Sequence, residues 1–184
     1  MNRKTHLQWI TQTAVLLALL VTLQAITKPF GQLVTGSFVN AVLAVSVLVA
    51  GLPSGIVVAL SSPVLAYLLG IAPQPLTVPA IMVGNGIYVL ILHLLADRQG
   101  KNLPRQILAW ITAAAAKFAT LYAIVVWLIC GVLSERLLAS GTMKPPMLKV
   151  LPATFSWPQL ITALIGGAVA LAMFPVLKKA LKKG

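Results

Sequence analysis

Acidic residues are almost absent from this sequence. Its 184 residues include 2 Asp and Glu against 14 Lys and Arg, and charged residues make up only 9% of the chain. A soluble domain has about 25% charged residues, so this chain has too few to cover a surface that faces water. Since 59% of the residues are hydrophobic and the mean hydropathy is +0.98, the composition predicts an integral membrane protein.

Other scarce features exclude several kinds of site. The single cysteine, Cys130, lies in an apolar run, which excludes an internal disulfide and a cysteine-based metal site. The sequence has no phosphate-binding loop, so we expect no ATPase activity in this chain. It also has no His-Glu-x-x-His motif and no carboxylate pair, so we expect no catalytic residues, no metal and no cofactor.

Transport by this chain alone is also disfavoured. No inverted repeat is visible, as a secondary transporter would often show, and no ring of acidic residues indicates a cation channel. The net charge of +12 would suggest a nucleic-acid partner in a soluble protein. Here no soluble domain remains to form a groove, so the charge indicates positive cytoplasmic loops and a lipid bilayer, with no nucleic acid.

Long apolar runs account for most of the chain. A helix needs about 20 residues to cross a bilayer, and six stretches qualify. Their continuous hydrophobicity differs from the alternation of transmembrane strands, and the first run is too long for a cleavable signal peptide. We therefore predict one all-α membrane domain over residues 1–184, with spans near 7–26, 33–52, 53–70, 77–95, 106–133 and 157–177.

The distribution of Lys and Arg predicts the orientation. Six spans place both termini on one side, which carries nine Lys and Arg residues, whereas the other side carries four. The positive-inside rule then makes both termini cytoplasmic. The outer side has polar loops at residues 27–32 and 71–76 and a third loop at residues 134–156, which contains three prolines and which we expect to form a lid.

One ionisable residue lies at full membrane depth. Lys117 is near the middle of the fifth span, where a charge costs about 2.5–3.5 kcal/mol on insertion scales and marks a functional site. Both interfaces are roughly 15 Å away, beyond a comfortable reach for its side chain. Since no carboxylate lies within the spans, we expect a ligand anion or backbone carbonyls to neutralise the charge.

Uncharged polar residues are concentrated in the outer half of the spans. Asn85 interrupts the fourth span between two glycines, at about the depth of Lys117, and its amide serves either an interhelical hydrogen bond or a ligand. This pattern predicts a cavity that opens outward. Its candidate residues, besides Lys117 and Asn85, are Asn40, Tyr88, Thr120 and Gln159.

The chain resembles the substrate-binding S component of an energy-coupling factor (ECF) vitamin transporter. The resemblance covers almost the whole chain and includes its size, its six spans, its polar outer loops and Ala14-x-x-x-Ala18 in the first span. The stretches Thr35-GSFVNA-Val42 and Ser62-PVLAYLLGIAPQPLTVPAIMVG-Asn85 look like those of S components for pantothenate.

The resemblance implies capture of a vitamin from outside a bacterial cell membrane. It implies a pocket formed by outer loops and spans four to six. It also implies delivery with a membrane coupling subunit and two ATPase subunits, so that this chain itself is not an enzyme. Ala14 and Ala18 would face the coupling subunit.

The residues themselves bear on the substrate. A buried lysine without a nearby acid disfavours cationic vitamins. Lys117 would bind the carboxylate of pantothenate, and Asn85, Gln74, Asn40 or Gln159 would hydrogen-bond the rest. Trp157 and Tyr88 would pack against its dimethyl group. The alternatives are hydroxymethylpyrimidine, pyridoxine, riboflavin, biotin or folate as the vitamin, or a self-sufficient small channel or transporter.

Overall fold

Helices are the regular secondary structure of this chain wherever the structure, a computed structural model, describes it, which is over residues 3–71, 74–97, 99–100 and 102–181. Two α-helices continue into π-helical segments, and two short 3₁₀ turns occupy connections. In chain order the elements are α1 (Arg3–Thr27), η1 (Lys28–Phe30), α2 (Gln32–Val45), η2 (Ser46–Ala50), α3 (Leu52–Leu68), η3 (Pro75–Thr77), α4 (Val78–Leu95), α5 (Leu103–Leu121), η4 (Tyr122–Val132), α6 (Ser134–Ala139), α7 (Met147–Phe155) and α8 (Trp157–Leu181).

The predicted all-α membrane fold is confirmed. Among the described residues, five helical segments are long and apolar enough to cross a membrane, and α3 is a shorter apolar helix of 17 residues. Seventeen residues of α-helix extend about 25 Å, which is at the short end of the range for a transmembrane helix. The six apolar helices match the six predicted spans.

Glycine and proline separate the first three helices. Gly31 and Gly51 have φ angles of 85° and 91°, a left-handed region that only glycine adopts without strain. Each of these glycines directly precedes the next helix, and Pro53 then occupies the first turn of α3, where its missing N–H is not needed. The connection between η2 and α3 is therefore the single residue Gly51.

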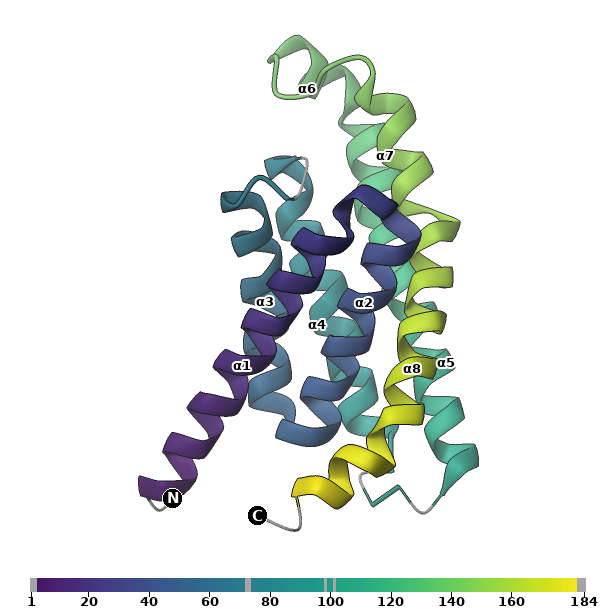
Figure 1. Ribbon diagram of the computed structural model, residues 1–184. Helices are drawn as coiled ribbons and strands as arrows, with labels where there is room; N and C mark the ends of the chain where they lie inside the picture. The colour runs from purple at the N-terminus through teal and green to yellow at the C-terminus, as the bar shows by residue number, and fades with distance from the viewer. Residues whose placement is uncertain (1–2, 72–73, 98, 101, 182–184) are drawn as a thin grey trace.

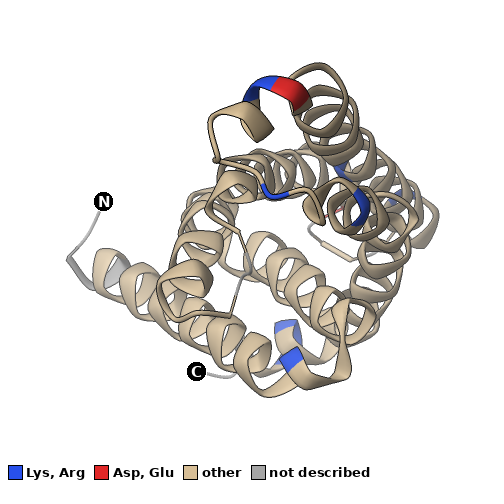
Figure 2. Cartoon of the chain, turned by 90° about the horizontal axis from the view of Figure 1, so that it is seen from above, with Lys and Arg blue, Asp and Glu red and all other residues tan. Residues whose placement is uncertain are grey.

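The helices form an upright bundle with both chain ends at one end of it (Figure 1). The turn between η2 and α3 and the connection from α4 to α5 lie at this same end, whereas α6 and α7 project at the opposite end. Seen from above, charged residues occupy few positions along the ribbon (Figure 2). Large hydrophobic side chains are exposed along the helices between the two ends, among them Leu19, Val64 and Ile165, as expected for a surface that contacts lipid.

The segment 134–156, which was predicted as a loop, contains the two helices α6 and α7. Helix α6 continues directly from η4, and α7 begins after Pro146, a residue that favours helix starts. Met147, Leu151 and Phe155 recur at four-residue spacing and are buried against η4, so α7 is an amphipathic helix packed on the bundle.

A labelling experiment tests the predicted orientation. In a Cys130→Ser background, Thr142→Cys should react with a membrane-impermeant maleimide on intact cells, and Gln99→Cys should react only after lysis, because these exposed positions lie at opposite ends of the bundle. The reverse pattern would place both termini outside the cell and overturn the orientation.

Candidate functional site

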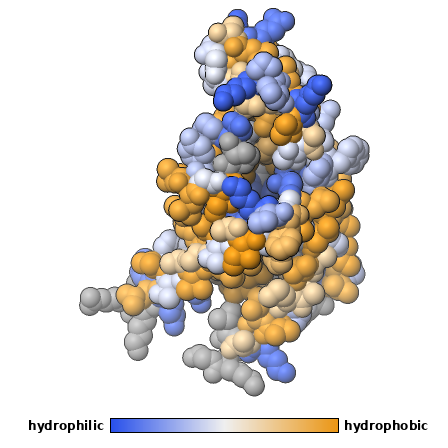
Figure 3. Space-filling view, turned by 45° about the horizontal axis from the view of Figure 1, so that its top comes forward, coloured by the Kyte–Doolittle hydropathy of each residue, from blue (hydrophilic) through white to orange (hydrophobic). Residues whose placement is uncertain are grey.

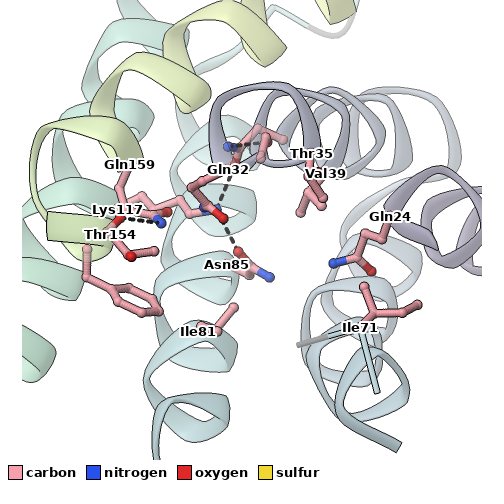
Figure 4. Close-up of a pocket in the computed structure, with 13 residues that line it drawn as sticks. Gln24, Gln32, Thr35, Val39, Ile71, Ile81, Asn85, Lys117, Thr154 and Gln159 are labelled. Atoms are coloured by element: carbon pink, nitrogen blue, oxygen red, sulfur yellow. Dashed lines mark hydrogen bonds between the residues drawn. The ribbon is translucent and has the colours of Figure 1, made fainter. Parts of the chain in front are cut away.

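Lys117 is buried in the middle of the bundle. It lies on α5, only 3% of its surface is exposed, and its Nζ donates hydrogen bonds to Asn40 Oδ1 at 2.6 Å and Asn85 Oδ1 at 2.7 Å (Figure 4). The ammonium therefore joins α2, α4 and α5. Within the chain its partners are two side-chain amide oxygens rather than the backbone carbonyls that were one of the two expectations, and the expected ligand anion stays a prediction.

One N–H donor of the Lys117 ammonium remains available for a further hydrogen bond. An ammonium has three N–H donors, and among the described residues only the two amide oxygens accept hydrogen bonds from it. The ring of Tyr88 lies 5.6 Å from Nζ, within the range of a cation–π interaction. The only carboxylates in the chain are those of Asp97 and Glu135, which do not line the site, so the charge has no anionic partner within this chain.

Asn40 uses both ends of its amide within the protein. Its Nδ2 donates to Gly36 O at 2.8 Å and to Thr162 Oγ1 at 3.3 Å, and the Thr162 hydroxyl in turn donates to Gln159 O at 3.1 Å. The amide is 1% exposed. Asn40 thus connects Lys117 to α8 and is held in one orientation.

A cavity of about 130 Å³ lies beside this cluster, roughly ten times the space that one bound water requires. Hydrophilic residues gather on the upper face of the molecule below the α6–α7 segment, while hydrophobic residues cover the flanks (Figure 3). Six helices (α1, α2, α4, α5, α7 and α8) and the connection between α3 and η3 contribute to the cavity walls. The lining residues are Gln24, Gln32, Thr35, Gly36, Val39, Asn40, Ile71, Ile81, Asn85, Lys117, Thr154, Phe155 and Gln159.

Three buried polar atoms at the cavity have no hydrogen-bond partner among the described residues. These atoms are Gln24 Oε1, Thr35 Oγ1 and Asn85 Nδ2. Buried polar groups are nearly always hydrogen-bonded, because leaving one unpaired costs about 1–3 kcal/mol. These atoms are therefore available to hydrogen-bond water or a polar small molecule in the cavity.

Comparison with known proteins agrees with this architecture. The family model for the substrate-specific component of ECF transporters matches residues 8–178. This chain belongs to that family. The searches of curated proteins and of solved structures returned no match. The chain is therefore the substrate-binding subunit of a membrane transporter, and the cavity around Lys117 is the candidate site of this S component.

Four of the eight predicted site residues line the cavity. Lys117, Asn85, Asn40 and Gln159 come together from α5, α4, α2 and α8. Gln159 Nε2 also donates to Thr154 O at 3.2 Å, which links the ends of α7 and α8. Polar groups in apolar helices are costly when unpaired, so their meeting at one place is expected physically.

The other four predicted residues lie outside the cavity lining. Tyr88 is fully buried beside Lys117, and its hydroxyl donates to Ala163 O at 3.5 Å. The Thr120 hydroxyl donates to Ala116 O of its own helix at 2.8 Å.

Trp157 is 67% exposed and stacks on Phe118, with ring centroids 5.5 Å apart. Gln74 lies in the connection before η3, where its carbonyl accepts from Thr77. Of these four, only Tyr88 contacts the site.

Five polar or aromatic residues of the cavity were not among the predicted site residues. Part of this set follows a readable pattern, since Gln32, Thr35, Gly36 and Asn40 share one face of α2 at helical spacing. The first two spans therefore contribute to the cavity in addition to spans four to six. The missed residues are Gln24, Gln32, Thr35, Thr154 and Phe155.

Proposed function

We propose that this S component captures pantothenate from outside a bacterial cell and passes it inward. The observation that carries the proposal is the buried ammonium of Lys117, which faces a cavity lined by no carboxylate. A ligand carboxylate would neutralise this charge in a site that excludes water, where a pair of opposite charges interacts more strongly than in water. A cationic vitamin would be repelled by the same group.

The remaining groups of the cavity complement the rest of pantothenate. This vitamin has one carboxylate, an amide, two hydroxyls and a dimethyl group. Gln24 Oε1 and Thr35 Oγ1 can accept hydrogen bonds from its hydroxyl or amide donors. The side chains of Val39, Ile81 and Phe155 provide an apolar wall for the dimethyl group.

The functional groups of the alternative vitamins also bear on the choice. Pyridoxine, hydroxymethylpyrimidine and riboflavin lack a carboxylate that would pair with the ammonium of Lys117. Biotin and folate have a carboxylate and N–H donors, so direct binding measurements decide between them and pantothenate.

The first test is mass spectrometry of small molecules released from the purified chain, followed by calorimetric titration. We expect pantothenate at about one molecule per chain and tight rebinding. Release of another vitamin would refute the substrate, although the transporter family would stand. Flux into liposomes that contain this chain alone would instead support the alternative of a self-sufficient transporter.

Delivery requires partners, which we propose are the ECF membrane coupling subunit and two ATPases. Helix α1 is attached to the bundle along a narrow seam that includes the buried residues Thr13 and Leu20. The Thr13 hydroxyl lies 2.7 Å from that of Ser54 on α3. Ala14 and Ala18 are exposed beside this seam, and such small residues let another helix approach closely. This face of α1 is therefore our candidate for the coupling-subunit contact.

A further inference from the structure

The three polar side chains in the centre of the site differ in what they can offer a ligand. Asn40 and Asn85 both present Oδ1 to Lys117 Nζ, at 2.6 and 2.7 Å. An ammonium can only donate hydrogen bonds, so it fixes which end of each amide faces it. The orientation of both amides is thus set by the lysine.

The opposite ends of the two amides have different surroundings. The NH₂ group of Asn40 is occupied by Gly36 O and Thr162 Oγ1. The NH₂ group of Asn85 has no partner, although the side chain is only 1% exposed and lines the cavity. In Figure 4 the nitrogen of Asn85 points away from Lys117, toward the side on which Gln24 lies. Asn85 therefore offers the cavity a donor and no acceptor.

We propose that Lys117 and Asn85 form a two-donor clamp for a carboxylate, and that Asn40 is a positioning residue that holds the lysine without contacting the ligand. One carboxylate oxygen accepts the remaining N–H of the ammonium, and the other accepts from Asn85 Nδ2. This assignment rests on the proposed function and makes Asn85 the residue that distinguishes an acid from an alcohol.

The clamp explains why two asparagines accompany one lysine. A single amide would satisfy one N–H of the ammonium and leave its direction loosely defined. Two acceptors on α2 and α4 fix the ammonium, and the remaining donor is then shared with the ligand. Because both ends of the Asn40 amide are hydrogen-bonded within the protein, Asn85 is the one of the two asparagines that can add a second hydrogen bond to the bound anion.

The test compares two ligands that differ at one group, pantothenate and pantothenol, in which a primary alcohol replaces the carboxylate. Asn85→Asp keeps the shape of the side chain and the oxygen that faces Lys117, but it replaces the cavity donor by a negatively charged oxygen. We expect the affinity for pantothenate, measured by calorimetry on the full chain, to fall at least 100-fold. The affinity for pantothenol should change less than tenfold.

A matched pair of variants separates the clamp from the support of the lysine. Asn40→Leu and Asn85→Leu each remove one acceptor of the ammonium, but only Asn85→Leu removes the cavity donor. We expect Asn85→Leu to weaken pantothenate binding at least tenfold more than Asn40→Leu, with similar pantothenol affinities in both. Equal losses of pantothenate affinity in the two variants would overturn the clamp.

The outcomes also separate the clamp from the choice of vitamin. If the wild-type protein binds pantothenate and the Asn85→Asp variant binds it with the same affinity, the clamp is refuted and the proposed function stands. If a vitamin panel identifies a different carboxylate ligand, the substrate is wrong, and the Asn85→Asp effect on that ligand decides the clamp. A ligand without an anionic group refutes both.

Discussion

Replacing Lys117 by Met should abolish tight pantothenate binding while the protein remains folded. Methionine has a similar length and fits a buried apolar site, but it removes the only charge at the cavity. Loss of one partner of a desolvated charge pair costs about 2–5 kcal/mol, which corresponds to a roughly 30-fold to several-thousand-fold weaker affinity. Calorimetric titration of the purified variant measures this directly.

The stability of the ligand-free variant should change much less than its affinity. The substitution leaves Asn40 Oδ1 and Asn85 Oδ1 without a donor, which is destabilising, but it also removes a buried ammonium that has no anionic partner. A saturating ligand stabilises the wild-type chain by mass action, and this increase in melting temperature should disappear in the variant.

Thr120→Val is the matched control for this prediction. Thr120 lies three residues further along α5, but its hydroxyl donates to Ala116 O and it does not line the cavity. Its replacement should leave the affinity within about twofold of wild type. Retention of wild-type affinity by Lys117→Met would exclude the lysine as the carboxylate site, whatever the ligand.

The hydrophobic pattern predicted the membrane helices well because a bilayer imposes a minimum apolar length. The second predicted span, 33–52, corresponds to the helical segment Gln32–Ala50, and the last, 157–177, corresponds to α8. The segment 134–156 holds no apolar run of spanning length, so this constraint does not apply to it. Its prolines suggested a loop, yet Pro145 and Pro146 precede α7, where proline favours a helix start.

The centre of the site was predictable for a related reason. A polar side chain deep in an apolar helix needs a partner, so the depths of Lys117 and Asn85 indicated that they would meet. Gln24, Gln32 and Thr154 lie near helix ends, where polar residues cost little and therefore give no signal in the sequence. Residues in connections, such as Gln74, have no helical periodicity that would predict a direction for the side chain.

The direct partners of Lys117 could not be derived from the sequence. Its hydrogen bonds to Asn40 and Asn85 depend on how closely α2, α4 and α5 approach one another, which is set by packing. Helices α2 and α8 form the most extensive helix pair in the described chain. Small residues allow these two helices to pack closely. Gly36 on α2 faces Thr162, and Gly166 on α8 faces Asn40.

Gly166→Ala should therefore disrupt both the fold and the site. A Cβ atom at this position would overlap Ser37 O and lie 2.6 Å from Asn40 Cβ and 2.7 Å from Ala41 N, and two of these three contacts are with backbone atoms that cannot rotate away. Overpacking of this kind costs about 1–3 kcal/mol, even though alanine is the better helix former. The melting temperature in detergent should fall, and pantothenate affinity should fall with it, since α2 carries Asn40.

The same substitution at Gly86 provides the control. Gly86 lies on α4 next to Asn85, but a Cβ atom there would meet nothing within 4 Å. Gly86→Ala should therefore raise the stability by up to about 1 kcal/mol through helix propensity and leave binding unchanged. If Gly166→Ala had the same melting temperature and pantothenate affinity as Gly86→Ala, the close contact between α2 and α8 would not be needed to position Asn40. If Gly166→Ala lost stability but kept its affinity, the lysine would be held independently of this helix pair.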